Sequence, residues 1–195
     1  LNNSGRLIYV GSGTSGRLGV LDASECPPTF GVSKDLVVGL IAGGDIALKE
    51  SVEGAEDNCQ SSIRQLNKIK FNSKDVILGV SASGTTPFVI SALKYARKIG
   101  ASTGFLTCND IDKADYVQDL IKVIVGPEIL SGSTRLKSGT ATKMVLNMIS
   151  TVAMIKLNRT FGNVMIDLLP KNKKLINRSI DIIMNELSIN KKINT

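Results

Sequence analysis

Two glycine-rich segments carry hydroxyl side chains of the kind that bind phosphate. Residues 11–17 read GSGTSGR, residues 81–87 read SASGTTP, and each directly follows a short apolar run. At the start of a helix, free backbone N–H groups and the helix dipole favour a phosphate group, and hydroxyl groups add hydrogen bonds. Either segment alone could simply cap a helix. The two together predict a phosphate site.

A third polar segment follows the last of the apolar runs. Residues 126–140 read GPEILSGSTRLKSGT and place Arg135 and Lys137 just before a helix-length stretch. A guanidinium can hold an oxyanion through two hydrogen bonds, and a lysine adds a mobile positive charge. The segment is therefore predicted to bind an anionic group, and the alternative interpretation is a solvated turn.

Proton transfer has to use groups other than histidine, because the sequence contains none. Carboxylates, lysines and tyrosines remain as acids and bases. Glu25 is followed by Pro27 and Pro28, which are predicted to end a helix and fix the chain locally. Glu53 and Glu56 lie one helical turn apart if their segment is helical, so either could face a cleft. These glutamates are candidates for acid–base chemistry.

Metal and disulfide chemistry are not indicated by the cysteines. Cys26, Cys59 and Cys108 are an odd number without a C-x-x-C pair. This pattern argues against a zinc cluster and a disulfide framework, and it fits a reducing cytoplasm. We therefore expect no metal, no other cofactor and a cytoplasmic location.

Residues 11–16 also match the G-x-G-x-x-G pattern of dinucleotide-binding domains. That pattern requires an acidic residue about 20 positions further on, at the end of the second strand. Here the second apolar run ends near Ile41 and is followed by Ala-Gly-Gly before Asp45. Dinucleotide binding is therefore the less favoured interpretation.

These segments need a scaffold, and the apolar pattern predicts one. Short, nearly continuous apolar runs predict five strands that are buried on both faces, as in a parallel sheet. Longer segments between and after them predict helices. The result is an α/β fold, a three-layer α/β/α sandwich with a five-stranded parallel sheet and ligands at the carboxyl ends of the strands. The predicted strands are residues 7–10, 36–41, 76–80, 104–107 and 121–125, and the helices are 15–23, 56–68, 87–99 and 140–157.

The last of these helices has an apolar face. Its members recur at the spacing of one helix face, and we predict that this face packs into the core. They are Ala141, Met144, Val145, Met148, Val152 and Ile155.

The amino-acid composition limits the classes of molecule that this chain can bind. The 195 residues carry a net charge of +7, with 43% hydrophobic and only 4% aromatic residues. Few aromatic residues argue against a nucleic-acid surface, and the basic residues after Pro170 fit a solvated helix followed by a frayed end, residues 190–195. No apolar run approaches the roughly 20 residues of a membrane span, and no signal peptide is visible. We expect one domain over residues 1–195 that binds an anionic small molecule, not nucleic acid or membrane.

Several long motifs resemble the N-acetylmuramic acid 6-phosphate etherases. The first covers residues 5–31, from the first strand through DASECPPTFG. Residues 39–44 (GLIAGG), 52–57 (VEGAED) and 126–137 follow the same family, and the resemblance extends from about residue 5 to residue 175. It implies a sugar isomerase (SIS) fold and cleavage of the D-lactyl ether of N-acetylmuramic acid 6-phosphate to N-acetylglucosamine 6-phosphate and D-lactate.

The resemblance also assigns roles to residues. Glu25 matches the family's general acid, and the second catalytic glutamate falls at Glu56 rather than Glu53. The implied reaction removes the C2 proton, expels lactate from C3 and adds water to the unsaturated aldehyde. Phosphate and sugar contacts carry over to Thr14, Ser15, Ser83, Thr86, Ser133 and Arg135. Family members commonly pair, so a homodimer is expected.

Two departures from the family and two rival functions stand beside this interpretation. Thr85 occupies a position where many relatives carry arginine, and the chain lacks most of the helical segments that relatives carry at either end. A non-catalytic sugar-phosphate sensor, similar to the glucokinase regulatory proteins, is the main alternative and would need no glutamate pair. Aldose–ketose isomerisation is a further alternative and would release no lactate.

Overall fold

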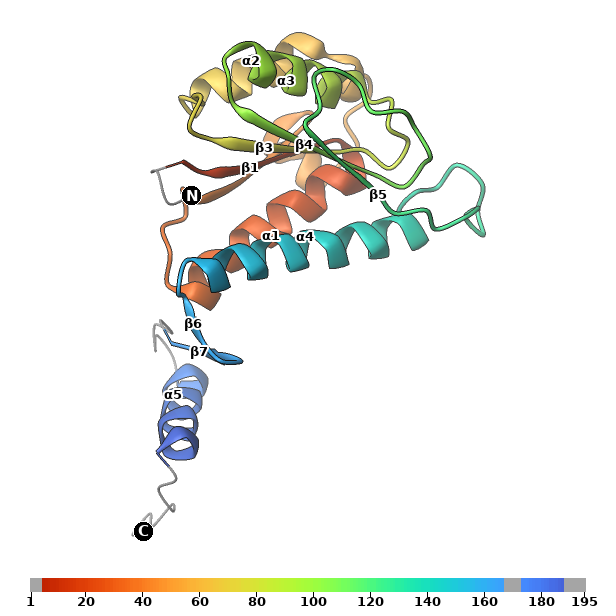
Figure 1. Cartoon of the computed structure of the whole chain (residues 1–195). Helices are drawn as coiled ribbons and strands as arrows, with labels where there is room; N and C mark the ends of the chain where they lie inside the picture. The colour runs from red at the N-terminus through yellow and green to blue at the C-terminus, as the bar shows by residue number, and fades with distance from the viewer. Residues whose placement is uncertain (1–4, 167–172, 188–195) are drawn as a thin grey trace.

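The computed structural model describes residues 5–166 and 173–187 as a layered α/β arrangement (Figure 1). The predicted frayed end, residues 190–195, lies outside the described residues. The main elements are β1 (Leu7–Gly11), α1 (Gly13–Phe30), β2 (Val37–Ile41), η1 (Gly44–Leu48), η2 (Ala55–Asp57), α2 (Cys59–Lys68), β3 (Val76–Val80), α3 (Pro87–Lys98), β4 (Ser102–Thr107), β5 (Asp119–Lys122) and α4 (Lys137–Lys156). A small hairpin, β6 (Thr160–Phe161) and β7 (Val164–Met165), precedes α5 (Lys173–Glu186).

The sheet is parallel with strand order β2-β1-β3-β4-β5, which confirms the predicted fold class. Helices α1 and α4 cover one face, and α2 and α3 cover the other (Figure 1). Alternate residues of β1 therefore enter different cores: Ile8 and Val10 pack toward α2 and α3, whereas Leu7 and Tyr9 pack toward α1 and α4. Burial on both faces explains why the strands are nearly continuous in apolar residues.

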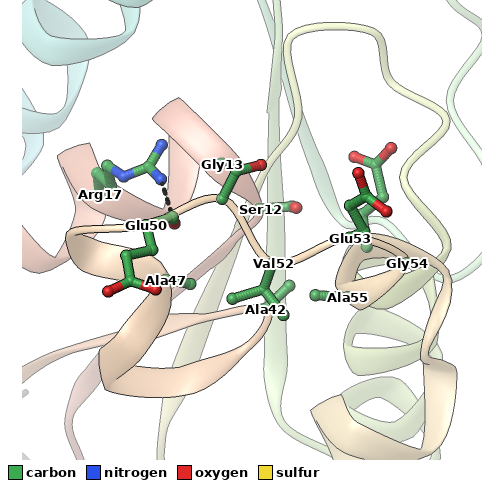
Figure 2. A pocket seen from close by; sticks show the side chains of 12 residues that line it. Ser12, Gly13, Arg17, Ala42, Ala47, Glu50, Val52, Glu53, Gly54 and Ala55 are labelled. Atoms are coloured by element: carbon green, nitrogen blue, oxygen red, sulfur yellow. Dashed lines mark hydrogen bonds between the residues drawn. The ribbon is translucent and has the colours of Figure 1, made fainter.

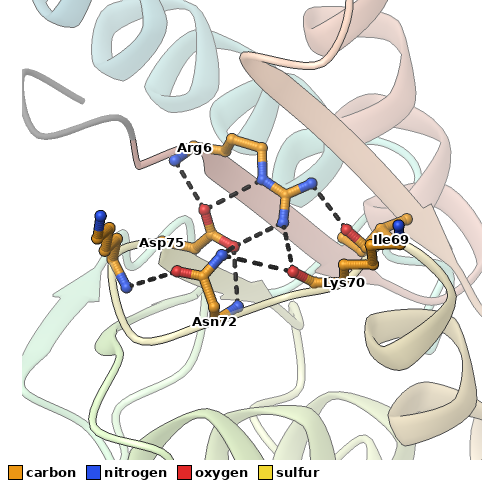
Figure 3. Close-up of polar contacts among 6 residues, drawn as sticks. Arg6, Ile69, Lys70, Asn72 and Asp75 are labelled. Atoms are coloured by element: carbon orange, nitrogen blue, oxygen red, sulfur yellow. Dashed lines mark hydrogen bonds and ion pairs between the residues drawn. The ribbon is translucent and has the colours of Figure 1, made fainter.

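An ion pair fixes the edge of the sheet where the strands begin (Figure 3). The Arg6 guanidinium donates to both carboxylate oxygens of Asp75, and it also donates to the carbonyls of Ile69 and Lys70. Asn72 donates to Asp75 through its backbone N–H. The cluster ties the entry of β1 to the turn between α2 and β3.

The prediction that the two prolines end the first helix is wrong. Helix α1 continues through Pro27 and Pro28 to Phe30 and ends at Gly31, whose φ of 63° is left-handed and whose N–H donates to the Pro27 carbonyl. The prolines lie in the last turn, so the helix loses only the two N–H groups that they lack. Glu25 is therefore held within a helix and not beside its end.

Two element boundaries also differ from the predictions. Helix α2 begins at Cys59, three residues after Glu56, because Gly54 is left-handed with a φ of 65° and the chain first makes the short turn η2. Glu53 and Glu56 are therefore not related by a turn of α-helix. Strand β5 ends at Lys122, so the predicted strand over residues 121–125 is displaced.

The prediction that the apolar face of α4 packs into the core is wrong for most of its members. Met144, Met148, Val152 and Ile155 are each about half exposed, between 48% and 58%. The buried face carries residues at a spacing of four, namely Thr142, Leu146, Ser150 and Met154. Polar residues turn inward because Asp22 of α1 binds the side chains of Asn147 and Ser150.

Among the helices of the described residues, none combines the length and apolar character that a membrane span requires.

Candidate functional site

The three polar segments meet where the strands end. The Cys108 N–H at the end of β4 donates to the Ala82 carbonyl, and the Asn109 side chain donates to the Ser83 carbonyl. The start of α4 lies beside the first segment, because a Cβ built on Gly139 would approach the Thr14 methyl to 3.4 Å. The strand order reverses between β1 and β3, the point where open α/β sheets bind ligands. The structure therefore brings the predicted segments to one edge.

The first segment is shaped by close backbone packing. A Cβ on Gly11 would lie 2.6 Å from the Gly16 nitrogen, and a Cβ on Gly16 would lie 2.6 Å from the Ile41 side chain. Gly13 is left-handed, with a φ of 52°. The glycine spacing is thus explained by a tight strand-to-helix turn and needs no dinucleotide. Thr14 and Ser15 lie in the first turn of α1 and are partly exposed.

The second segment forms a network of hydroxyl groups around Ser81. This buried hydroxyl lies 2.8 Å from the Thr86 hydroxyl and 3.3 Å from that of Ser83, and it accepts the Gly84 N–H. Thr85 donates its hydroxyl to Ser83. Ser83 remains exposed at the surface, so it is available to a ligand. Sequence reasoning missed the organising role of Ser81, although its place at the strand end was a signal.

In the third segment, the Glu128 carboxylate near its start binds the backbone near its end. Glu128 accepts the backbone N–H groups of Lys137 and Ser138, each at 2.9 Å, at the start of α4. The hydrogen bond from Ser138, together with that from Lys137, lowers the pKa of Glu128. These two N–H groups are therefore occupied. An anion at this segment has to be held by side chains such as those of Ser133 and Arg135, of which Arg135 is exposed.

A cavity of about 350 Å³ lies beside the first segment (Figure 2). Ser12 and Gly13 line one side, and the chain from Glu50 to Glu56 lines the other. Arg17 holds that chain in place, because its guanidinium donates to the carbonyls of Leu48 and Glu50. Both Glu53 and Glu56 line the cavity. Sequence reasoning missed Arg17, whose partners are carbonyls far along the chain.

Glu25 lines a different cavity, of about 320 Å³, between α1 and α4. It lies twelve residues beyond Gly13, the first residue of α1, or about 18 Å along the helix axis. The other polar side chains of this cavity are those of Asp22, Lys143 and Asn147. One chain therefore brings Glu56 to the edge where the polar segments meet but leaves Glu25 in the middle of the α1–α4 face.

A buried network supports this second cavity. Asp22 accepts the hydroxyls of Tyr9 and Ser150 and the side-chain N–H of Asn147. Burial, reinforced by Asp22, raises the pKa of Tyr9, and burial raises the pKa of the Cys26 thiol to about 12. Tyr9 is therefore a hydrogen-bond donor here and not a base. Tyr9 is thereby removed from the candidates for proton transfer in this cavity.

Residues 5–166 and 173–187 contain no cluster of side chains that could bind a metal ion. No three His, Cys, Asp or Glu side chains in this part of the chain are placed to hold a metal ion. All three cysteines are free, and Cys59 is exposed.

Comparison of the sequence with known proteins gives close relatives. Residues 1–97 match the family model of the glucokinase regulatory protein N-terminal SIS domain. N-acetylmuramic acid 6-phosphate etherase 2 of Vibrio cholerae is 58% identical over 92% of this chain and 59% of its own length. The N-acetylmuramic acid 6-phosphate etherase of Christiangramia forsetii is 53% identical over 98% of this chain and 70% of its own length. The chain thus spans between about three fifths and 70% of these relatives.

Solved structures confirm the fold. A putative phosphosugar isomerase from Bacteroides fragilis superimposes with a TM-score of 0.59 at 18% identity, over 82% of this chain and 78% of its own. A protein of Escherichia coli CFT073 gives a TM-score of 0.58 at 16% identity, over 80% of this chain and 72% of its own. At these identities the likeness concerns the fold alone.

Proposed function

Because the chain belongs to the family of N-acetylmuramic acid 6-phosphate etherases, we propose that it cleaves the D-lactyl ether of N-acetylmuramic acid 6-phosphate. The products are N-acetylglucosamine 6-phosphate and D-lactate, which makes the reaction a carbon–oxygen lyase reaction followed by hydration. The observation that carries the proposal is the 53% identity to the Christiangramia forsetii etherase over 193 residues. The polar segments at the end of the sheet offer hydroxyl groups and a guanidinium group, which can bind a phosphate.

The phosphate binds where the three segments meet. Ser83 and Thr86 offer hydroxyl groups from the second segment, and Thr14 and Ser15 do so from the start of α1. Ser133 and Arg135 add the side chains of the third segment, with Arg135 as the charged contact. Glu128 occupies the two N–H groups at the start of α4, so these side chains carry the anion on that side.

The chemistry is an elimination followed by an addition. In the open-chain sugar the aldehyde acidifies the C2 proton, and the Glu56 carboxylate removes it. The resulting electron pair forms the C2–C3 double bond while the C3–O bond breaks, and Glu25 protonates the departing ether oxygen. Water then adds at C3, and the two carboxyl groups exchange roles. No step in this sequence calls on a metal.

The separation of the two glutamates supports a homodimer. Within one chain Glu25 and Glu56 line different cavities, and Glu25 lies about 18 Å along α1 from Gly13, which lines the Glu56 cavity. Two groups that act on neighbouring carbon atoms of one sugar have to lie closer together than this. The exposed apolar face of α4 gives a second copy a surface to bury. In the proposed dimer, Glu25 of one subunit completes the site that contains Glu56 of the other. We also propose a cytoplasmic location, which the three free cysteines support.

A sugar-phosphate sensor is the second candidate, because residues 1–97 match a domain of the glucokinase regulatory protein. The deciding experiment incubates the full chain with N-acetylmuramic acid 6-phosphate and measures D-lactate and N-acetylglucosamine 6-phosphate. We expect both products in equal amounts. Tight binding of the sugar phosphate without lactate would favour the sensor, and a rearranged sugar without lactate would favour an isomerase.

A further inference from the structure

The Glu25 cavity contains a lysine to which the reaction described above gives no role. Lys143 projects from α4 into the same cavity as Glu25, and its side chain is exposed. Among the described residues it forms no hydrogen bond or ion pair. Its ammonium group is therefore available to a ligand that enters this cavity.

The carboxylates that line the cavity do not neutralise Lys143. Asp22 is only 5% exposed, and its two oxygens are occupied by the side chains of Tyr9, Asn147 and Ser150. Glu25 lines the cavity but forms no ion pair with Lys143 within the described part of the chain. In the proposed reaction Glu25 enters as the protonated acid. An anionic ligand would then meet the exposed Lys143 ammonium group and a neutral Glu25 carboxyl group, while the Asp22 carboxylate is buried and hydrogen-bonded to its three neighbours.

The substrate carries an anion that has to lie close to Glu25. Glu25 protonates the ether oxygen, and that oxygen is bonded to the lactyl carbon that bears the carboxylate. The carboxylate oxygens are therefore separated from the protonated oxygen by only two carbon atoms. A carboxylate that leaves bulk water needs a cation or hydrogen-bond donors in return. Lys143 is the cation among the residues that line this cavity.

From this arrangement we infer that Lys143 binds the lactyl carboxylate and makes the enzyme specific for the lactyl ether. The inference rests on the proposed function, because it takes Glu25 as the acid that acts on the ether oxygen. Lys143 belongs to the same subunit as Glu25, so the pair stays together whichever subunit supplies the phosphate segments. Sugar phosphates without a lactyl group do not use Lys143.

The test compares two substrates and two lysines. One substrate is N-acetylmuramic acid 6-phosphate, and the other is the 3-O-ethyl ether of N-acetylglucosamine 6-phosphate, which lacks the carboxylate. For Lys143→Met we expect kcat/KM for the lactyl ether to fall by about 10- to 100-fold, the range for a hydrogen bond to a charged group. The value for the ethyl ether and the Ki of N-acetylglucosamine 6-phosphate should stay within about twofold. Lys143→Arg should retain part of the preference.

Lys98→Met is the control, because Lys98 is also an exposed helical lysine but belongs to α3, on the opposite face of the sheet from this cavity and from the proposed dimer surface. It should leave both substrates unaffected. Equal losses for the two ethers in Lys143→Met would indicate a merely structural role and overturn the inference, as would an unchanged preference for the lactyl ether. A wild-type chain that releases no lactate would instead overturn the proposed function, and the specificity role with it.

Discussion

Glu53 and Glu56 flank a left-handed glycine and line one cavity, so the two carboxylates are close competitors for the role of base. Their roles separate in deuterated water, because C2 deprotonation and ether cleavage are distinct steps. Glu56→Gln should lose both exchange of the C2 proton and lactate release. Glu25→Gln should lose lactate release but retain exchange, since it removes only the acid. Mass spectrometry of the recovered sugar measures both the exchange of the C2 proton and the loss of the lactyl group.

Glu53→Gln is the control for this series, and it should exchange and turn over normally. If Glu53→Gln abolishes exchange while Glu56→Gln does not, the base is Glu53. Normal turnover by all three variants would rule out the glutamate-pair mechanism.

At the residue scale the sequence located the polar segments but not their partners. The glycines and hydroxyls of the first two segments lie next to each other in sequence, so their pattern was readable. Arg17 and Lys143 were missed, because their significance depends on groups more than 30 positions away in the chain. The role of Glu128 was missed for a related reason, since only the folded segment returns Lys137 and Ser138 to its carboxylate.

At the scale of elements, the apolar runs predicted the five strands of the sheet and their order along the chain, although the fifth strand is displaced from residues 121–125 to Asp119–Lys122. The errors on α4 and α1 arise because the local pattern of a segment does not show which other elements it packs against. The apolar residues of α4 have the spacing of a core helix but are exposed. The opposite face is buried instead, because the Ser150 hydroxyl donates a hydrogen bond to the buried Asp22 of α1. Pro27 and Pro28 are tolerated because they lie in the last turn of α1.

The Arg6–Asp75 pair gives a stability prediction for the sheet edge. Burial alone would raise the pKa of Asp75, but the hydrogen bonds from Arg6 and Asn72 lower it overall. A lowered pKa stabilises the fold above about pH 4 and stops doing so as the pH falls through the lower, folded-state pKa. Asp75→Asn should therefore cost about 3 kcal/mol near neutral pH, the range for breaking a buried pair.

Urea unfolding between pH 2 and pH 7 measures this effect. The difference between Asp75→Asn and wild type should shrink toward the acid end of that range. Asp110→Asn, which breaks the exposed pair with Lys122, is the control and should leave the midpoint almost unchanged. A difference for Asp75→Asn that does not change with pH would show that the charge of Asp75 is not responsible.

At the scale of the whole molecule, the separated glutamates and the exposed face of α4 make a joint prediction. Met148→Glu places a charge in that face and should give a monomer in sedimentation experiments, with loss of lactate release. Lys98→Glu changes charge on α3, on the opposite side of the sheet, and should remain dimeric and active. A wild-type chain that is active as a monomer would contradict the shared site.

The activity of mixed dimers also tests whether each active site is shared between two subunits. Glu25→Gln and Glu56→Gln subunits are each inactive, but a dimer that contains one of each has one site with both glutamates intact. Random mixing of the two variants should therefore restore about a quarter of wild-type activity. Sites contained within single subunits would restore none.

The oxygen balance of the reaction tests the central claim most directly. The chain is incubated with N-acetylmuramic acid 6-phosphate in water enriched in oxygen-18, and both products are analysed by mass spectrometry. Elimination followed by hydration predicts that D-lactate keeps the original ether oxygen, while N-acetylglucosamine 6-phosphate carries oxygen-18 at C3. Label in the hydroxyl of lactate, or no lactate from a chain that binds the substrate, would contradict the account.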